Sequence, residues 1–374
     1  MANNRLAEAF HPGVFLEEEL EARGWTRADL AEILGRSPND ISIIITGKRG
    51  VSPETAIGLG DAFGTGPEYW MNLETAYQLA QADSKRQDIS LKARLYEKFP
   101  VREICKRGWV EATTDVDLLI KRFCKFFEIP ILEAVVKFNH AAKKSTEYSD
   151  TTSLQCSWLF KARQLARKAM LTNSFSVSKL KVLKAKLRLL MHESEEIKKI
   201  PDLMAEAGIR FVIVEWLPGG KLDGATFWLD NGSPVIAMSL LKDRIDNFWF
   251  VLMHELSHVE KGEGKEEPII DIDLFSQNSP LDRPDIELRA DRDAVEFCVP
   301  QTELANFIVR TDPYYSQQKI QGFAYVHKIH PGIVVGQLQK HDRVGWNHHR
   351  KLLVKIRHII TEPSLTDGYG FETR

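Results

Sequence analysis

The sequence predicts a mostly α-helical protein with one small α+β region in its second half. Helical periodicity fills the first 85 residues and continues, with polar breaks, to about residue 200. Beyond Pro201 the pattern changes to short runs rich in β-forming residues, bounded by Gly, Pro and Asn. These runs are Ile209–Leu217, Ala225–Leu229 and Pro234–Met238. Helical patterns return from Asp246 onward, so we expect helices to pack around a small sheet.

The composition is that of a globular protein, with 374 residues of which 43% are hydrophobic and 27% charged. Such a chain can bury a core, and it has no apolar run of the roughly 18 residues that a membrane span needs. No apolar segment follows Met1–Arg5, and the four cysteines form no CxxC pair. We therefore expect a cytoplasmic protein with no membrane partner. The net charge of −2 predicts no polyanion partner, so function must come from local features.

Composition divides the chain into four predicted segments. We expect an all-α N-terminal domain over residues 1–85, ending at the polar run Gln81–Asp88, which is either a linker or an exposed helix end. A helical connecting region should follow over 86–195, then a mixed α+β domain over 196–345. The remaining residues, 346–374, read as a basic and polar tail that frays at its end.

Residues Thr26–Ser42 have the pattern of a helix-turn-helix. Thr26 suits the N-cap of a first helix, Gly35 suits the turn, and Ser37 can cap a second helix. The apolar positions that would bury the two helices are Leu30, Ile33, Leu34, Ile41, Ile44 and Ile45. The second helix would then present its outward side chains to a DNA major groove. An ordinary helical hairpin is the alternative that this spacing leaves open.

Three further stretches extend this pattern, namely His11–Leu16, Thr46–Ala56 and Gly66–Leu73. With them, residues 6–82 resemble the HigA-type antitoxins, which are DNA-binding autorepressors of the Cro/repressor superfamily. The resemblance implies operator DNA as a partner, and a toxin as a further one. Arg36 is a departure, because the family usually has a small apolar residue there.

The charge of this domain restricts how it can bind DNA. Its first 80 residues hold roughly twice as many carboxylates as Lys and Arg side chains, whereas phosphate contact drives non-specific binding. DNA must therefore bind a small patch, whose candidates are Arg27, Arg36, Ser37, Asn39, Asp40, Ser42, Lys48 and Arg49. One such patch binds weakly, so we expect a homodimer on a two-fold operator. The alternative role of the domain is protein binding, to a toxin or to its own twin.

A metal-binding motif, HExxH, lies within Met253–His258. His254 and His258 are four residues apart, so both imidazoles leave one face of a helix and can bind one ion. Hydrolytic zinc sites use three protein ligands and one open position, and Glu287 offers the third ligand. Asp291, one turn later, could accept the free ring N–H of a ligand histidine. The alternatives are two surface histidines and a surface aspartate.

The context of this motif resembles the ImmA/IrrE metallopeptidase family over about residues 195–340. The stretches that carry the resemblance are Leu222–Trp228, Pro234–Ser239, Asn247–His258 and the run from Glu287 to Pro300. It implies a zincin-like fold, Zn²⁺ as cofactor and a protein substrate. It also implies His254, His258 and Glu287 as zinc ligands and Glu255 as general base. Asp293 departs from the family, which tends to have an aromatic residue there.

Peptide hydrolysis also needs a donor for the tetrahedral oxyanion, and His330 is our candidate. Helix capping is the alternative role of this histidine, and Tyr314 and Tyr315 are other candidate donors. We expect a protein substrate to bind in extended form along a strand edge such as Ala225–Leu229.

Three functions remain open from the sequence. The leading one is a DNA-binding transcriptional regulator with a zinc-dependent endopeptidase that cleaves a repressor, an antitoxin or itself. The second is a HigA-type antitoxin and autorepressor whose zinc domain is a sensor or scaffold without proteolytic activity. The third is a peptidase whose N-terminal domain only binds protein and dimerises.

Overall fold

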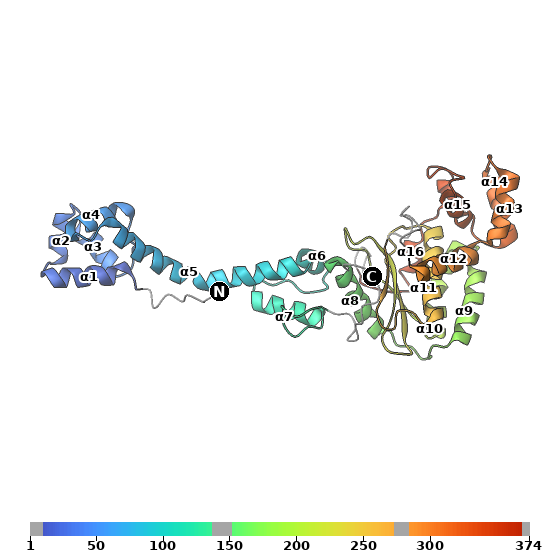
Figure 1. Cartoon of the computed structure of the whole chain (residues 1–374), viewed down its shortest axis with the longest axis horizontal. Coiled ribbons are helices and arrows are strands. Elements are labelled where there is room, and N and C mark those ends of the chain that lie inside the picture. Colours follow the sequence, from blue (N-terminus) through green and yellow to red (C-terminus); the bar gives the residue numbers. More distant parts are fainter. Residues whose placement is uncertain (1–9, 137–151, 273–283, 369–374) are drawn as a thin grey trace. The chain divides into compact units, whose positions relative to one another are not determined.

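The computed structural model describes residues 10–136, 152–272 and 284–368. The chain divides into two compact units, Met1–Arg94 and Leu95–Arg374 (Figure 1). The run Gln81–Asp88, expected to be a linker or an exposed helix end, is part of one continuous helix, α5 (Pro67–Lys98), and the boundary between the units lies later than predicted. None of the described helices is both long and apolar enough to cross a membrane.

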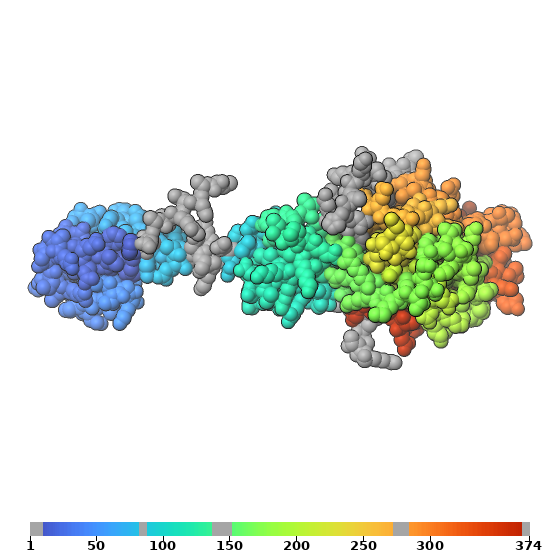
Figure 2. Space-filling view, turned by 90° about the horizontal axis from the view of Figure 1, so that it is seen from below, coloured from blue at the N-terminus to red at the C-terminus, as the bar shows by residue number. Residues whose placement is uncertain are grey.

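The first unit is all-α, as predicted, and is drawn in blue in Figure 2. Its helices are α1 (Pro12–Arg23), α2 (Arg27–Ile33), α3 (Pro38–Ile45), α4 (Pro53–Phe63) and the first part of α5. Thr26 caps α2 in a capping box with Asp29, and Ser37 caps α3 by accepting from the Asp40 amide. Gly35 lies between them with φ of +60°, which confirms the predicted turn.

The core of this unit follows most of the predicted apolar pattern. Buried side chains include Leu16, Leu30, Ala31, Ile41, Ile44, Leu59 and Trp70. Ile33 was predicted to be buried, but it is the last residue of α2 and is 51% exposed. The close approach of α1 to α3 depends on Gly13, where a Cβ would lie only 2.3 Å from the Ile44 carbonyl oxygen.

The second unit contains a five-stranded mixed sheet in the order β4-β2-β3-β1-β5. The strands are β1 (Arg210–Ile213), β2 (Leu222–Trp228), β3 (Pro234–Met238), β4 (Ile269–Ile272) and β5 (Leu365–Thr366). Strand β1 runs parallel to β3 and β5, whereas β2 runs antiparallel to β3 and β4. The three predicted β runs thus form the centre of the sheet, and the two edge strands were not predicted.

Helices cover both faces of this sheet. One face carries α6 (Val101–Lys106), α7 (Val116–Phe126) and α8 (Ser153–Lys168). On the other side lie α9 (Val177–Leu190), η1 (Ser194–Lys199), α10 (Ile200–Glu206), α11 (Ile245–Lys261), α12 (Asp285–Cys298), α13 (Gln301–Thr311), α14 (Gln317–His327), α15 (Pro331–Lys340), η3 (Arg350–Leu352) and α16 (Arg357–Ile360). Of these, α10 and α11 pack against the sheet, whereas α12 and α15 pack against α11. Strand alternation explains this, because Val212 packs with the first group and Phe211 with the second.

Two predicted segments are therefore not independent. The connecting region 86–195 contributes α8, which packs against β1. The predicted tail 346–374 is ordered over its first part, because it supplies η3, α16 and the edge strand β5. Its last residues, 369–374, lie outside the described residues.

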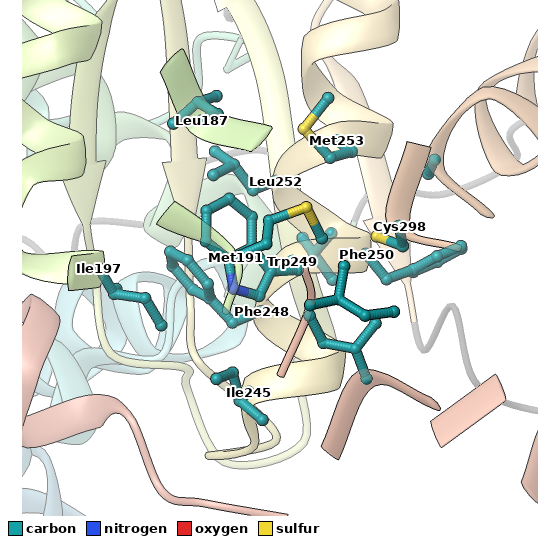
Figure 3. Close-up of a cluster of buried hydrophobic side chains, with 14 of the residues drawn as sticks. Leu187, Met191, Ile197, Ile245, Phe248, Trp249, Phe250, Leu252, Met253 and Cys298 are labelled. Carbon is teal, nitrogen blue, oxygen red and sulfur yellow. The ribbon is translucent and has the colours of Figure 1, made fainter. Parts of the chain in front are cut away.

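Helix α11 is the centre of the second unit, and every residue from Ile245 to Val259 is buried. Its aromatic side chains Phe248, Trp249 and Phe250 lie in a cluster with Met191 and other apolar residues (Figure 3). Gly262 ends the helix with φ of +70°. This burial fixes α11 against the sheet, so side chains on its remaining face are held in defined positions.

Candidate metal centre and nucleic-acid interface

Four side chains converge beside the sheet to form a candidate metal centre. They are His254 and His258 from α11, Asp271 from β4 and Glu287 from α12. Their ligand atoms all lie within 4.8 Å of one another, and each side chain is at most 3% exposed. The structure brings together the three residues predicted as ligands, and it adds Asp271, which sequence reasoning missed.

Helix α12 can approach α11 closely because the residues of α12 that face α11 are small. Ala290 and Ala294 are both fully buried, one turn and two turns after Glu287. Ser257 on α11 also donates a hydrogen bond to Asp293 Oδ2 at 2.7 Å. Asp293, the predicted departure from the family, thus joins the two helices by a polar contact.

Strand pairing explains the position of Asp271. It pairs with Gly224 of β2, and Ile269 pairs with Thr226. Paired residues in an antiparallel sheet point to the same face, and both Gly224 and Thr226 lie against Glu255 of α11. Asp271 therefore points toward α11 and reaches the motif through strand pairing rather than through helical spacing.

A carboxylate lies next to the Nδ1 atom of each histidine, on the side of the ring away from the cluster. His254 Nδ1 lies 2.9 Å from Asp291 Oδ1, and His258 Nδ1 lies 2.8 Å from Glu263 Oε2. Arg289 fixes Glu263 in turn, with Nη2 at 2.6 Å. Glu263 accepts the Nδ1 proton of His258, and Asp291 is close enough to His254 Nδ1 to pair with it. With Nδ1 protonated, each ring leaves the lone pair of Nε2 for the cluster. The predicted proximity of Asp291 to His254 is observed, whereas Glu263 was missed although it follows the helix terminator Gly262.

Three electron-pair donors surround His254 Nε2. His258 Nε2 lies at 3.0 Å, Glu287 Oε2 at 3.1 Å and Asp271 Oδ2 at 3.3 Å. One ring nitrogen carries at most one proton and cannot satisfy three acceptors. A shared cation satisfies all of them at once, so the donor set fits a metal ion.

The spacing also fits zinc. Zinc bonds to nitrogen and oxygen of about 2.0–2.1 Å place two ligands of a tetrahedron about 3.3 Å apart. The separations from His254 Nε2, between 3.0 and 3.3 Å, are close to this value, and His258 Nε2 lies 3.7 Å from Glu287 Oε1. Burial, and then the Asp271 carboxylate, raise the pKa of Glu287 to about 7. A divalent cation relieves this concentration of negative charge.

Glu255 lies beside the cluster and is fully buried. Thr226 Oγ1 donates to Oε2 of Glu255 at 2.6 Å. A Cβ atom at residue 224 would lie only 2.2 Å from Oε1 of Glu255, so the carboxylate fits here because residue 224 is glycine. Burial, and then the neighbouring Asp271 carboxylate, raise the pKa of Glu255 well above its ordinary value. A carboxyl group with a raised pKa, held next to a metal centre, suits proton transfer.

The structure does not bring the predicted oxyanion donors to this centre. His330 caps α15, where its Nδ1 accepts from the Gly332 amide at 3.1 Å. Gly332 packs against Ile245, and nine residues of α11 separate Ile245 from His254, or about 13 Å along the helix. The capping alternative therefore describes His330. Tyr314 is 79% exposed, and the hydroxyl of Tyr315 donates to Asp312 at 3.4 Å.

On the helix-turn-helix surface, three of the four predicted cationic residues are paired within the unit. The pairs are Arg27 with Glu17 at 2.6 Å, Arg36 with Glu54 at 3.5 Å and Arg49 with Asp40 at 3.3 Å. Lys48 is exposed, and no ion pair to it is found among the described residues. These ion pairs neutralise the arginines that a DNA phosphate would contact. They therefore weaken DNA binding further in a domain that already has an excess of carboxylates.

The polar residues of the same surface divide into two groups. Ser37 is used within the fold, because it caps α3 and donates to Asp40 Oδ2 at 2.7 Å. Asn39 is exposed on α3, and Ser42 is half-buried with its Oγ 3.4 Å from Arg27 Nη1. Asn39 and Ser42 thus remain candidates for base contact, whereas the hydroxyl of Ser37 already makes contacts within the fold.

We predict that Asp291→Asn weakens zinc binding roughly 10- to 100-fold, because the amide no longer orients the His254 ring as the carboxylate does. The matched control is Asp293→Asn, which makes the same charge change two residues along α12 and touches Ser257. Competition titration with a chromophoric chelator measures both affinities. Equal affinities in the two variants would contradict the role of Asp291.

Comparison with known proteins identifies the family to which the first unit belongs. Residues 13–69 match the helix-turn-helix domain family. Virulence-associated protein I of Dichelobacter nodosus is 38% identical over 22% of this chain and 78% of that protein. The HTH-type transcriptional regulator YddM of Escherichia coli is 33% identical over 24% of this chain and 96% of that protein.

Among solved structures, the HigA-family antidote protein from Coxiella burnetii is 36% identical, with a TM-score of 0.21, over 21% of this chain and 87% of that one. The Pseudomonas aeruginosa antitoxin HigA, solved with the higBA promoter, is also 36% identical, with a TM-score of 0.21, over 21% of this chain and 88% of that one. The chain therefore belongs to the family of helix-turn-helix transcriptional regulators, through an N-terminal domain of the HigA antitoxin type.

Proposed function

We propose that this protein is a DNA-binding regulator that carries a zinc-dependent endopeptidase in the same chain. The observation that supports the peptidase is the convergence of His254, His258 and Glu287 beside the buried Glu255. The substrate class that fits a regulator of this type is a partner repressor or antitoxin, or the chain itself.

For the first unit we propose binding to operator DNA. The family match supports this, and the related Pseudomonas antitoxin was solved with a promoter. Because Arg27, Arg36 and Arg49 are already paired with carboxylates, one copy offers few free cations to phosphate. We therefore propose a homodimer on a two-fold operator, and a toxin as a further partner.

For the second unit, His254, His258 and Glu287 would hold Zn²⁺, which polarises a peptide carbonyl and promotes ionisation of water. Asp291 and Glu263 orient the two imidazoles, and the α11–α12 contact fixes the Glu287 carboxylate. Glu255 would take the proton of the attacking water and pass it to the leaving amine. Thr226 and Gly224 position Glu255 for this transfer.

One observation favours a second function, a regulator whose zinc site is structural. Asp271 offers a fourth protein ligand, and zinc sites closed by four protein ligands are typically structural. In that case the second unit is a sensor or scaffold and cleaves nothing.

We predict that the purified full chain contains one zinc per polypeptide and that His254→Ala reduces this content below one tenth, since the central ligand is lost. His330→Ala is the control, because this histidine caps α15 and lies away from the cluster. Inductively coupled plasma mass spectrometry after dialysis measures the metal. Full occupancy in His254→Ala would show that the cluster is not the metal site.

We predict that Glu255→Gln keeps its zinc but cleaves the protein encoded by the adjacent gene, or the chain itself, at least about 100-fold more slowly. The amide preserves the shape and the contact with Thr226 but cannot accept a proton. Intact-mass spectrometry of timed digests measures cleavage, and Glu267→Gln, an exposed residue before β4, controls for the charge change. Unchanged cleavage by Glu255→Gln would refute its role as general base.

We predict that Lys48→Ala weakens binding to the DNA upstream of its own gene about tenfold and lowers the slope of log K against log salt by about one. Lys92→Ala removes an equal charge from an exposed position on α5 and serves as the control. Fluorescence anisotropy at several salt concentrations measures both quantities. If the two variants behave alike, the surface around Lys48 does not contact phosphate.

A further inference from the structure

We propose that β4 is an internal inhibitory strand, which closes the peptidase site by placing Asp271 on the metal and by occupying the sheet edge that a substrate would use. This inference rests on the proposed function and adds its regulation. It makes the structure a latent state, in which Asp271 is a removable ligand and β4 a removable strand.

The first step is the place of Asp271 within the cluster. Its carboxylate lies 3.3 Å from His254 Nε2, and its strand partner Gly224 lies directly against the Glu255 carboxylate. In a zincin, the space between the metal ligands and the general base must admit the water that is to be deprotonated. Here that space contains the Asp271 carboxylate, so the three other ligands are complete while the open position is filled.

The second step is the place of β4 within the sheet. We expected substrate to pair with the edge of Ala225–Leu229, but β2 is an inner strand over Leu222–Thr226 because β4 pairs with it there. Ile270, for example, pairs with Ala225. A substrate that adds to this part of β2 in extended form must displace β4. The same movement withdraws Asp271, so one displacement would open both the edge and the metal.

The third step separates this state from a structural zinc site. A structural site needs four ligands but no adjacent base. Here Glu255 is held by Thr226, and residue 224 has no side chain that would collide with its carboxylate. Burying the Glu255 carboxylate costs free energy, and its position beside the cluster serves proton transfer only if water and substrate reach the metal.

The fourth step is the weak attachment of β4. It has four residues, forms one edge of the sheet, and its Ile269 and Ile270 are only half-buried. Among the β4 residues whose burial the structure describes, Asp271 is the buried one. Displacement has to break the pairing of this short strand with β2, the packing of the half-buried Ile270, and the contact of the Asp271 carboxylate with the cluster.

The experiment uses the full chain loaded with Co²⁺, whose visible absorption reports coordination without any substrate. Acetohydroxamate, which binds a metal only where a position is open, is titrated into the wild type, Asp271→Ala and Asp271→Asn. Glu267→Ala removes a carboxylate from the exposed segment before β4 and is the matched control. Metal content and far-ultraviolet circular dichroism of each protein are measured in parallel.

We expect one Co²⁺ per chain in every protein. Acetohydroxamate should bind the Asp271 variants at least about tenfold more tightly than the wild type and the control, because the closed fraction reduces apparent affinity. Equal affinity in wild type and folded variants would show that Asp271 does not close the site. Loss of metal from a folded Asp271→Asn would show instead that Asp271 is a permanent structural ligand. Failure of the wild type to bind metal is a different result, which refutes the proposed peptidase itself.

Discussion

The second unit depends on holding four electron-pair donors around one point in a dry interior. Three electron-pair donors within 3.3 Å of His254 Nε2 repel one another unless protons or a cation lie among them. The fold maintains this arrangement by burying α11 along most of its length and by packing it against α12 through two alanines. The sheet supplies the remaining wall, where Gly224 and Thr226 bring Glu255 to the cluster. The large apolar core of this unit thus supports a small polar centre.

The parts of this centre that could be predicted are those set by local geometry. Helical spacing places His254 and His258 on one face, and Asp291 one turn after Glu287. Asp271 could not be predicted in this way, because its position depends on an antiparallel pairing of β4 with β2 that includes an irregular register near Leu222. A four-residue strand carries too little alternation to be recognised, and the same holds for the two-residue β5.

In the first unit, too, local features could be predicted from the sequence, whereas contacts between helices could not. Caps at Thr26 and Ser37 and the left-handed Gly35 are local features, and the predicted helices agree with the structure around them. The polar composition of Gln81–Asp88 left open a linker or an exposed helix end, and these residues lie within α5 because Ala, Gln, Lys and Arg are good helix formers. Ion pairing across helices, such as Arg36 with Glu54, could not be deduced from spacing, although it decides how many cations DNA can use.

The two units share one physical device, which is the use of the chain's own carboxylates in place of an external ligand. On the helix-turn-helix surface, Asp40 and Glu17 neutralise arginines that a phosphate would otherwise contact. At the metal centre, Asp271 takes a place that water or a peptide carbonyl would otherwise use. Because DNA or a peptide must first break such a contact, the free energy of binding is less favourable by the free energy of breaking it. Under the proposed function, such a regulator would respond only when its partner is concentrated, or dimeric, enough to displace these internal carboxylates, so DNA binding and peptide hydrolysis would each have a threshold that arises from the fold.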